Sequence, residues 1–294
     1  MYYYRYGETV FASLLPDLPL ETADRPAAGT PGLFLIDRDP VSGRSSFCVS
    51  DARQLTARTE DVSWLDPSRM GVPIPALPKR VQHTIDARLL RAVNIRHPRW
   101  RDFARLPDKQ PSGRRRVNLL AVGDVGGTLL TALKLLGGDC IERIGICDLN
   151  QKAVSRWAAE MGQVSWPWDY DALPEVEPVS DEDLFRCDVF LFAATRGVPP
   201  VGGGVRDVRM AQFSANRPLV EQYARQARQA GFRGLFIVLS DPVDPLCKAA
   251  YLASNQGEDG QWDGLGLRAE QIQGFGLGVM NARAAYYAKQ APRF

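Results

Sequence analysis

The chain has 294 residues, which is long enough for one large domain or for two modest ones. Hydrophobic residues make up 45% and charged residues 24% of the chain, as in ordinary globular proteins, and a formal net charge of +2 argues against a general nucleic-acid-binding role. No apolar run approaches the roughly 18 residues of a membrane-spanning helix, and the N-terminal stretch MYYYRYGETVF lacks the apolar centre of a signal peptide. We therefore expect a cytoplasmic protein that contacts neither a membrane nor nucleic acid.

The five cysteines form no CxxC pair and show no metal-ligand spacing. Several of them stand in apolar runs, which favours buried, reduced thiols and a reducing compartment. We expect no metal site among them. They are Cys48, Cys140, Cys147, Cys187 and Cys247.

The first 56 residues are rich in strand-forming residues. Two pairs of such runs, each pair separated by a turn signal, are Tyr2–Tyr6 with Thr9–Leu15 and Leu33–Asp37 with Ser45–Ser50. The pattern predicts a small β-rich N-terminal domain built from hairpins.

Regular structure is expected to be sparse between this sheet and residue 116. Prolines recur from Ser63 to Arg80, which predicts an extended covering segment. Apolar residues at helical spacing predict a short helix over Thr84–Val93. A polar run rich in Pro, Gly, Lys and Arg then leads to Arg116, so we place a domain boundary at residue 115, between domains 1–115 and 116–294.

The stretch Val117–Asp148 has the order of a strand, a glycine-rich turn, a helix and a second strand. The apolar run Val117–Val122 meets the cluster GDVGG, and a second apolar run ends at Asp148. Small residues let the backbone approach a pyrophosphate, whose charge is favoured at a helix N-terminus. The acid lies 22 residues beyond Gly126, a spacing suited to the ribose of a dinucleotide. This order therefore favours dinucleotide binding.

The fingerprint of this turn reads A-x-G-x-x-G, with Ala121 in the place of the first glycine and Gly123 and Gly126 in the other two. Alanine can make the turn if its φ is negative, but its side chain puts the affinity for a cofactor in question. Two other interpretations stay open. Methyltransferases use a related layout to bind a methyl donor, and a glycine turn can be purely structural.

Strands and helices alternate from Val117 onward, which predicts a doubly wound parallel α/β sheet. The expected strands are Val176–Val179, Asp188–Ala193 and Leu235–Leu239, and the expected helices are Gln151–Met161, Arg209–Ala230, Pro245–Ser254 and Asn281–Gln290. We expect Pro218 to kink the longest helix or to start a new one, and Gly231 to end it. Residues 255–264 are expected to form a polar, flexible insertion.

Several ordered pieces of the second domain carry a family resemblance. The piece DVFLFAAT, from Asp188, stands where a fourth strand and its turn belong, LSDPVDPL is similar to V-S-N-P-V-D, and GFGLGVMNARAAYY is similar to G-S-G-x-x-L-D-S-A-R-x-R-Y. Arg209 stands seven residues before Asn216, as a mobile-loop arginine stands before a helix asparagine. In this order and spacing the chain, from Val117 onward, resembles the lactate/malate dehydrogenase family. The resemblance implies a Rossmann fold, NAD as the cofactor, and oxidoreductase chemistry on a small 2-oxo or 2-hydroxy acid.

The resemblance also implies roles for single residues. Arg283 matches the arginine that grips the substrate carboxylate through a bidentate pair, although a surface or helix-packing arginine is the competing interpretation. Arg209 matches the arginine that polarises the substrate carbonyl, with Arg206 as a competitor because Arg206-Asp207 imitates the R-D of malate enzymes. The predicted cofactor site consists of Ala121, Gly123, Asp124, Val125, Gly126, Asp148, Ala193, Ala194, Asn216 and Asp241.

Three departures from the family pattern bear on the chemistry. Asp241 replaces the asparagine of N-P-V-D and puts a negative charge where a carbonyl or carboxylate should be hydrogen-bonded. Met280 stands where the family has the aspartate that orients the catalytic histidine. The family's H-G-D histidine has no counterpart before Phe294, and the two histidines, His83 and His97, both precede the nucleotide domain.

Two functions are therefore expected. In the first, the chain is an NAD-binding protein without the family's histidine-dependent oxidation, a pseudoenzyme that acts as a sensor, regulatory or structural protein. In the second, it is an NAD-dependent 2-hydroxy-acid dehydrogenase in which the N-terminal domain supplies a replacement general acid, with His97 as the candidate. Asp148 favours NAD over NADP because its carboxylate would repel a 2′-phosphate. The dimers and tetramers of the family make a homo-oligomer possible.

Overall fold

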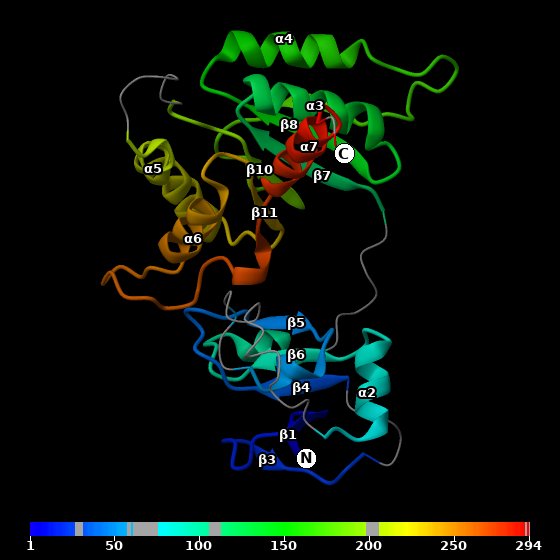
Figure 1. Cartoon of the computed structure of the whole chain (residues 1–294), viewed down its shortest axis with the longest axis vertical. Helices are drawn as coiled ribbons and strands as arrows, with labels where there is room; N and C mark the ends of the chain where they lie inside the picture. Colours follow the sequence, from blue (N-terminus) through cyan, green and yellow to red (C-terminus); the bar gives the residue numbers. More distant parts are fainter. Residues whose placement is uncertain are drawn as a thin grey trace. The chain divides into compact units, whose positions relative to one another are not determined.

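The computed structural model describes residues 1–26, 32–57, 60, 76–105, 113–197, 206–291 and 293. The chain forms two compact units, one of residues 1–110 with 257–270 and one of residues 111–256 with 271–294 (Figure 1). The chain thus passes from one unit to the other three times. Most of the predicted proline-rich covering segment, residues 63–80, lies outside the described residues.

The first unit is built on a six-stranded mixed sheet in the order β3-β1-β2-β4-β6-β5. The strands are β1 (Tyr2–Tyr6), β2 (Thr9–Ser13), β3 (Glu21–Thr22), β4 (Leu33–Ile36), β5 (Ser46–Cys48) and β6 (Arg91–Asn94). The predicted hairpin of β1 and β2 forms around Gly7, whose φ of +58° suits glycine. The second predicted hairpin is wrong, because β6 lies between β4 and β5 and pairs in parallel with β4 and antiparallel with β5. All four residues of β4 are buried, so this strand is a central one with a partner on each side.

The helix expected over Thr84–Val93 is displaced. Helix α2 spans Lys79–Asp86 and buries Val81 and Ile85 one turn apart, whereas the end of the expected helix is strand β6. Arg88, with a φ of +59°, separates the two elements. The described residues of this unit also form the short 3-10 helices η1 (Ala52–Leu55) and η3 (Trp100–Phe103), and η4 (Ala269–Gln271) begins in its residues 257–270.

The second unit carries a six-stranded sheet with all strands parallel, in the order β12-β11-β10-β7-β8-β9. The strands are β7 (Arg115–Leu120), β8 (Ile141–Cys147), β9 (Glu175–Pro178), β10 (Val189–Phe192), β11 (Leu235–Val238) and β12 (Ile272–Gly274). Numbered within the unit, the order is 6-5-4-1-2-3, which is the Rossmann order and confirms the predicted doubly wound fold. The order reverses between β7 and β10, and a dinucleotide binds such a sheet at the carboxyl ends of the strands beside this point.

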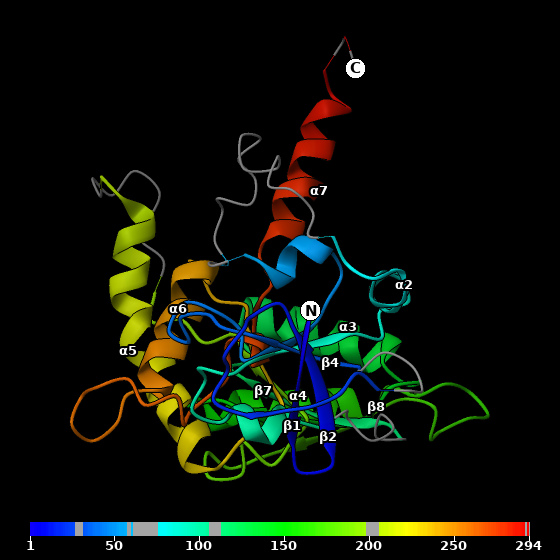
Figure 2. The same ribbon diagram turned by 90° about the horizontal axis from the view of Figure 1, so that it is seen from below.

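Helices cover both faces of this sheet, and right-handed crossovers on the two sides of the reversal place α3 with α4 and α5 with α6 on opposite faces (Figure 1). The helices are α3 (Asp124–Leu136), α4 (Gln151–Gly162), α5 (Val208–Gln229), α6 (Val243–Ser254) and α7 (Leu277–Ala288). Helix α7 extends away from the sheet (Figure 2), and its described side chains apart from Ala288 are exposed. None of the helices among the described residues is long and apolar enough to cross a membrane.

Two expectations for this unit need correction, and one strand was not predicted. Pro218 lies inside the uninterrupted helix α5 on its exposed side, where water can bond the carbonyl that a proline leaves free. The glycine-rich stretch before α7 contains strand β12, which pairs with β11. Most of the expected flexible insertion, from Gly257 onward, packs as part of the first unit.

Candidate functional site

The turn after β7 begins at Ala121, whose φ is +73°. The condition for an unstrained alanine in this turn, a negative φ, is therefore not met. The backbone keeps the left-handed conformation that glycine adopts readily, at a cost of about 1–2 kcal/mol for an L-residue. The Ala121 N–H donates to the Cys147 carbonyl at 2.8 Å, which holds the turn against the end of β8.

The two glycines of the fingerprint meet different demands. A Cβ on Gly123 would have no atom within 4 Å, so this side of the turn is open to a ligand. A Cβ on Gly126 would lie 1.9 Å from the Ala121 carbonyl oxygen, so only glycine lets α3 start this close to β7. Asp124 and Val125 are exposed in the first turn of α3, where backbone N–H groups have no acceptor within the helix.

Asp148 directly follows β8, and both oxygens of its carboxylate accept backbone hydrogen bonds. Oδ2 accepts from the Val122 N–H at 2.9 Å, and Oδ1 accepts from the Asn150 N–H at 2.9 Å. The carboxylate is therefore fixed beside the glycine turn, and each oxygen keeps a further lone pair for a ribose hydroxyl.

Trp157 on α4 belongs to this site although no sequence motif singled it out. Its Nε1 donates to the Val122 carbonyl at 3.0 Å, and a Cβ on Gly127 would lie 2.4 Å from its Cζ2 atom. The indole therefore packs directly on the first turn of α3 and holds the glycine turn in place. The sequence did offer one signal of this contact. Gly127 is a glycine that the fingerprint does not require, which indicates that another group packs closely against the helix there.

The carboxyl ends of β10 and β11 are tied together by side chains. Ser240 Oγ donates to the Ala194 carbonyl at 2.7 Å. Asn216 on α5 is 1% exposed, donates from Nδ2 to the Asp241 carbonyl at 2.9 Å, and accepts at Oδ1 from the Arg196 N–H at 2.8 Å. Asn216, predicted as a cofactor residue, thus uses both ends of its amide to fix the protein backbone.

Arg209 and Asp241, predicted from different motifs, meet at this edge of the sheet. Arg209 Nη1 lies 3.2 Å from Asp241 Oδ1, and the two side chains are 62% and 56% exposed. The competing Arg206 is exposed and has no ion pair among the described residues. The geometry therefore favours Arg209 over Arg206 as the arginine of this edge.

Arg283 lies on the exposed helix α7, and no described contact joins it to Arg209 or Asp241. Met280, one turn earlier on the same helix, is 49% exposed. The role of Arg283 as a carboxylate anchor stays a prediction.

His97 is part of the first unit and is 3% exposed. Its Nδ1 accepts from the Arg99 N–H at 3.2 Å, and its ring meets Phe103 and Trp262 edge-on, with centroids 5.9 and 6.2 Å away. Burial lowers the pKa of His97 below its ordinary value of 6.5, against the opposing effect of the Glu270 carboxylate. A neutral, enclosed imidazole supports a structural role, and a catalytic role stays a prediction.

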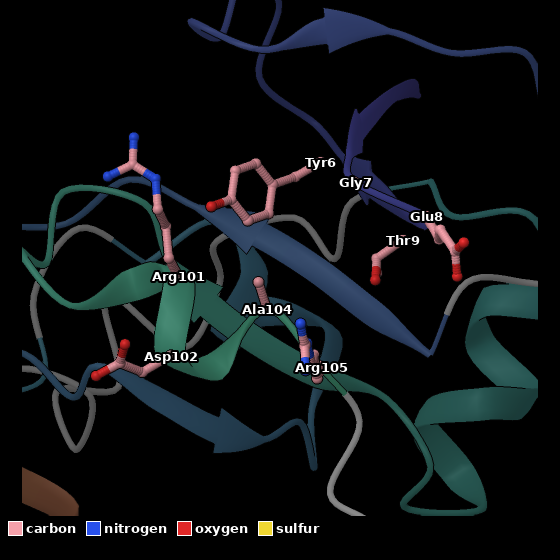
Figure 3. Close-up of a pocket in the computed structure, with 8 residues that line it drawn as sticks. All are labelled: Tyr6, Gly7, Glu8, Thr9, Arg101, Asp102, Ala104 and Arg105. Carbon is pink, nitrogen blue, oxygen red and sulfur yellow. The ribbon is translucent and has the colours of Figure 1, made fainter.

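The first unit also has a pocket of about 800 Å³ beside the turn between β1 and β2 (Figure 3). Tyr6 faces the 3-10 helix η3, where the Arg101 guanidinium lies 5.8 Å from the centre of the Tyr6 ring. Glu8, Asp102 and Arg105 give the lining charges of both signs. None of the site residues predicted from the sequence lines this pocket.

All five cysteines are free. Burial raises the pKa of Cys147 and Cys247 to about 11 and that of Cys187 to about 12, so these thiols are poor nucleophiles. Cys48 and Cys140 are exposed, so the expected burial is wrong for these two. No cluster of His, Cys, Asp and Glu side chains among the described residues could hold a metal ion.

Comparisons with known proteins point to one family, although no protein-family model matches the chain. L-lactate dehydrogenase 1 of Lactobacillus acidophilus is 26% identical over 146 residues, which cover 49% of this chain and 42% of that enzyme. L-lactate dehydrogenase of Treponema denticola is 26% identical over 141 residues, which cover 48% and 42%. The structure of MGS-M5, a lactate dehydrogenase from a Medee basin deep-sea metagenome library, has 20% identity and a TM-score of 0.44, over 62% of this chain and 52% of that one.

The chain spans less than half the length of the curated relatives that it matches, as the covered share of 42% shows. Within that share the sequence matches agree with the Rossmann strand order and with the glycine turn at its reversal point. Over about half of its length, the chain is therefore similar in sequence to L-lactate dehydrogenases, which supports the predicted resemblance to the lactate/malate dehydrogenase family.

Proposed function

We propose that the chain binds NAD at the turn after β7 and lacks the 2-hydroxy-acid oxidation of its relatives, so that it serves as a sensor, regulatory or structural protein. The geometry of the turn carries the proposal. Gly123 leaves the backbone accessible to a pyrophosphate, and Gly126 lets α3 begin where its free N–H groups can bind that pyrophosphate. The Asp148 carboxylate, fixed beside the turn, can accept hydrogen bonds from a ribose. NAD bound there would supply a hydride acceptor, and the Asp148 carboxylate would disfavour NADP.

The loss of oxidation is supported by two positions at which the family pattern is broken. Asp241, in place of an asparagine, is paired with Arg209, so a carboxylate occupies an edge that should receive an anionic substrate. Met280, in place of the aspartate that orients a catalytic histidine, has a side chain that cannot hold an imidazole by a hydrogen bond to a carboxylate. His97 is enclosed by aromatic side chains of the first unit, which supports its structural role.

Turnover separates this proposal from the alternative, a dehydrogenase that uses His97 as a replacement acid. NADH is mixed with the full chain and a panel of 2-oxo acids that includes pyruvate and oxaloacetate, and the loss of NADH absorbance is followed. We expect saturable NADH binding and no oxidation above the rate without protein. Oxidation of NADH that is abolished in Arg283→Ala or His97→Gln, while His83→Gln retains it, would establish the alternative. A cytoplasmic location and a homo-oligomer stay predictions.

A further inference from the structure

The ion pair of Arg209 and Asp241 occupies the half of the sheet on which the nicotinamide end of a bound NAD would lie. Asp148 marks the adenosine half, because it follows β8 on one side of the strand reversal. Asp241 follows β11 on the other side, and Arg209 lies in the first turn of α5, which leads into β11. A dinucleotide that spans the reversal therefore brings its reactive ring toward this pair.

The backbone under the pair is fixed, whereas the charged groups are accessible. Asn216 holds the Asp241 carbonyl at 2.9 Å, and Ser240 ties the preceding residue to the end of β10 at 2.7 Å. The guanidinium of Arg209 and the carboxylate of Asp241 remain more than half exposed. Exposed pairs of this kind contribute little to stability. Breaking the contact between the two side chains, so that each can bind a ligand instead, therefore costs little free energy.

The charges of the pair decide which ligand fits. One guanidinium and one carboxylate, 3.2 Å apart, sum to zero and present both signs to one small molecule. A 2-hydroxy acid carries a carboxylate alone, which Arg209 attracts and Asp241 repels. An α-amino acid carries a carboxylate and an ammonium group on neighbouring atoms, so Arg209 can take the first while Asp241 takes the second.

We propose that the Arg209–Asp241 pair makes this edge a site for the zwitterion of an α-amino acid and not for a 2-hydroxy acid. The proposal rests on NAD binding as proposed above, and it names the ligand of the nicotinamide half. In this arrangement the carboxylate of the amino acid accepts from the Arg209 guanidinium and its ammonium group donates to the Asp241 carboxylate. Asp241 is then the residue that determines specificity.

The test compares pairs of ligands that share a carbon skeleton and differ only in an ammonium or hydroxyl group. The full chain, first shown to bind NAD⁺, is saturated with it and titrated by calorimetry with L-alanine and L-lactate, L-valine and L-2-hydroxyisovalerate, and L-aspartate and L-malate. We expect at least one amino acid to bind at least tenfold tighter than its hydroxy-acid partner. Asp241→Asn should reverse that preference, whereas Asp244→Asn, which removes an exposed carboxylate three residues away on α6, should leave it unchanged.

The outcomes distinguish this proposal from the NAD proposal on which it depends. If NAD⁺ itself does not bind, both fail. If NAD⁺ binds but no amino acid of the panel does, or if hydroxy acids bind as tightly to the wild type as their amino-acid partners, only the zwitterion proposal is overturned. An amino-acid preference that survives Asp241→Asn overturns it as well, because the selecting group then lies elsewhere.

Discussion

Single residues of the glycine turn set both its strain and its accessibility. Ala121 holds a left-handed backbone, Gly126 removes a clash, and Gly123 leaves a side of the turn open. Trp157 holds the same turn through the Val122 carbonyl. Residues with a strained backbone, such as Ala121, are common at binding sites. The positive φ of Ala121 therefore supports the proposed NAD site at this turn.

Replacing Ala121 by glycine should stabilise the protein. The left-handed conformation costs alanine about 1–2 kcal/mol, which glycine avoids. The greater conformational freedom of glycine in the unfolded chain offsets about 0.5–1 kcal/mol of this gain. We expect Ala121→Gly to raise the free energy of unfolding by about 0.5–1 kcal/mol in urea titrations. Ala132→Gly, at an exposed position inside α3, should lower it by a similar amount. An Ala121→Gly variant whose free energy of unfolding falls, as that of Ala132→Gly is expected to, would contradict the strained φ of Ala121.

The buried imidazole of His97 should make the first unit sensitive to acid. Burial lowers the native pKa of His97 below 6.5, so the unfolded chain binds a proton more readily than the native chain. The stabilisation is complete above pH 6.5 and is lost as the pH falls through the lowered native pKa. We expect the free energy of unfolding to fall more steeply below pH 6.5 in the wild type than in His97→Gln. The exposed His83 is the control, and a His83→Gln variant that flattens the profile equally would refute this account.

At the scale of elements, the unit β7–turn–α3–β8 was predictable because its signals are local. The strand pattern, the glycines and the closing Asp148 all lie within the one stretch Val117–Asp148, and they place the turn and its flanking strands correctly. Strand β12 has three residues, and its extended structure depends on hydrogen bonds with β11, so no local sequence pattern predicted it. The placement of β6 between β4 and β5 likewise depends on contacts between distant residues.

The close approach of α3 to β7 makes a sharp prediction for Gly126. Its added Cβ would lie 1.9 Å from the Ala121 carbonyl oxygen, so the turn or the helix must move. We expect Gly126→Ala to destabilise the protein by at least about 2 kcal/mol, in the range of other overpacking changes, and to abolish NAD binding. Gly162→Ala, at the open end of α4, should not destabilise the protein and should leave NAD binding unchanged. Urea unfolding and calorimetry give the two readouts, and a stable Gly126→Ala variant would show that the approach is looser than described.

At the scale of the whole molecule, the chain interleaves its two units. Residues 257–270 leave the second unit after α6 and return to it at β12, yet they pack on the first unit. The Arg268 guanidinium lies 5.0 Å from the centre of the Phe103 ring, and a Glu270 oxygen accepts from the Ser45 N–H at 3.2 Å. The polar composition of residues 255–264 predicted a flexible insertion, because a packing partner such as His97, which meets the Trp262 ring edge-on, is more than 150 residues away in sequence.

The site shows the same division between local and distant causes. Sequence motifs located Gly123, Asp148, Arg209 and Asp241, because each follows a strand or begins a helix at a fixed spacing. They could not show that Arg209 and Asp241 form an ion pair, or that the Asn216 amide forms hydrogen bonds with the backbone. These contacts join residues 20 to 32 positions apart in the sequence. Motifs therefore predicted residues that lie at the ends of strands and the starts of helices, but not which of their side chains are in contact.

Binding of NAD⁺ to wild type and to Gly123→Val, measured by calorimetry, tests the central claim most directly. A side chain at Gly123 would meet no protein atom within 4 Å but would fill the side of the turn open to a pyrophosphate. We predict that Gly123→Val keeps the wild-type unfolding midpoint and weakens NAD⁺ binding at least tenfold, about 1.4 kcal/mol, while the control Gly162→Val, also in open space, binds as the wild type does. Undiminished binding by Gly123→Val, or a wild type that binds S-adenosylmethionine but not NAD⁺, would contradict the account.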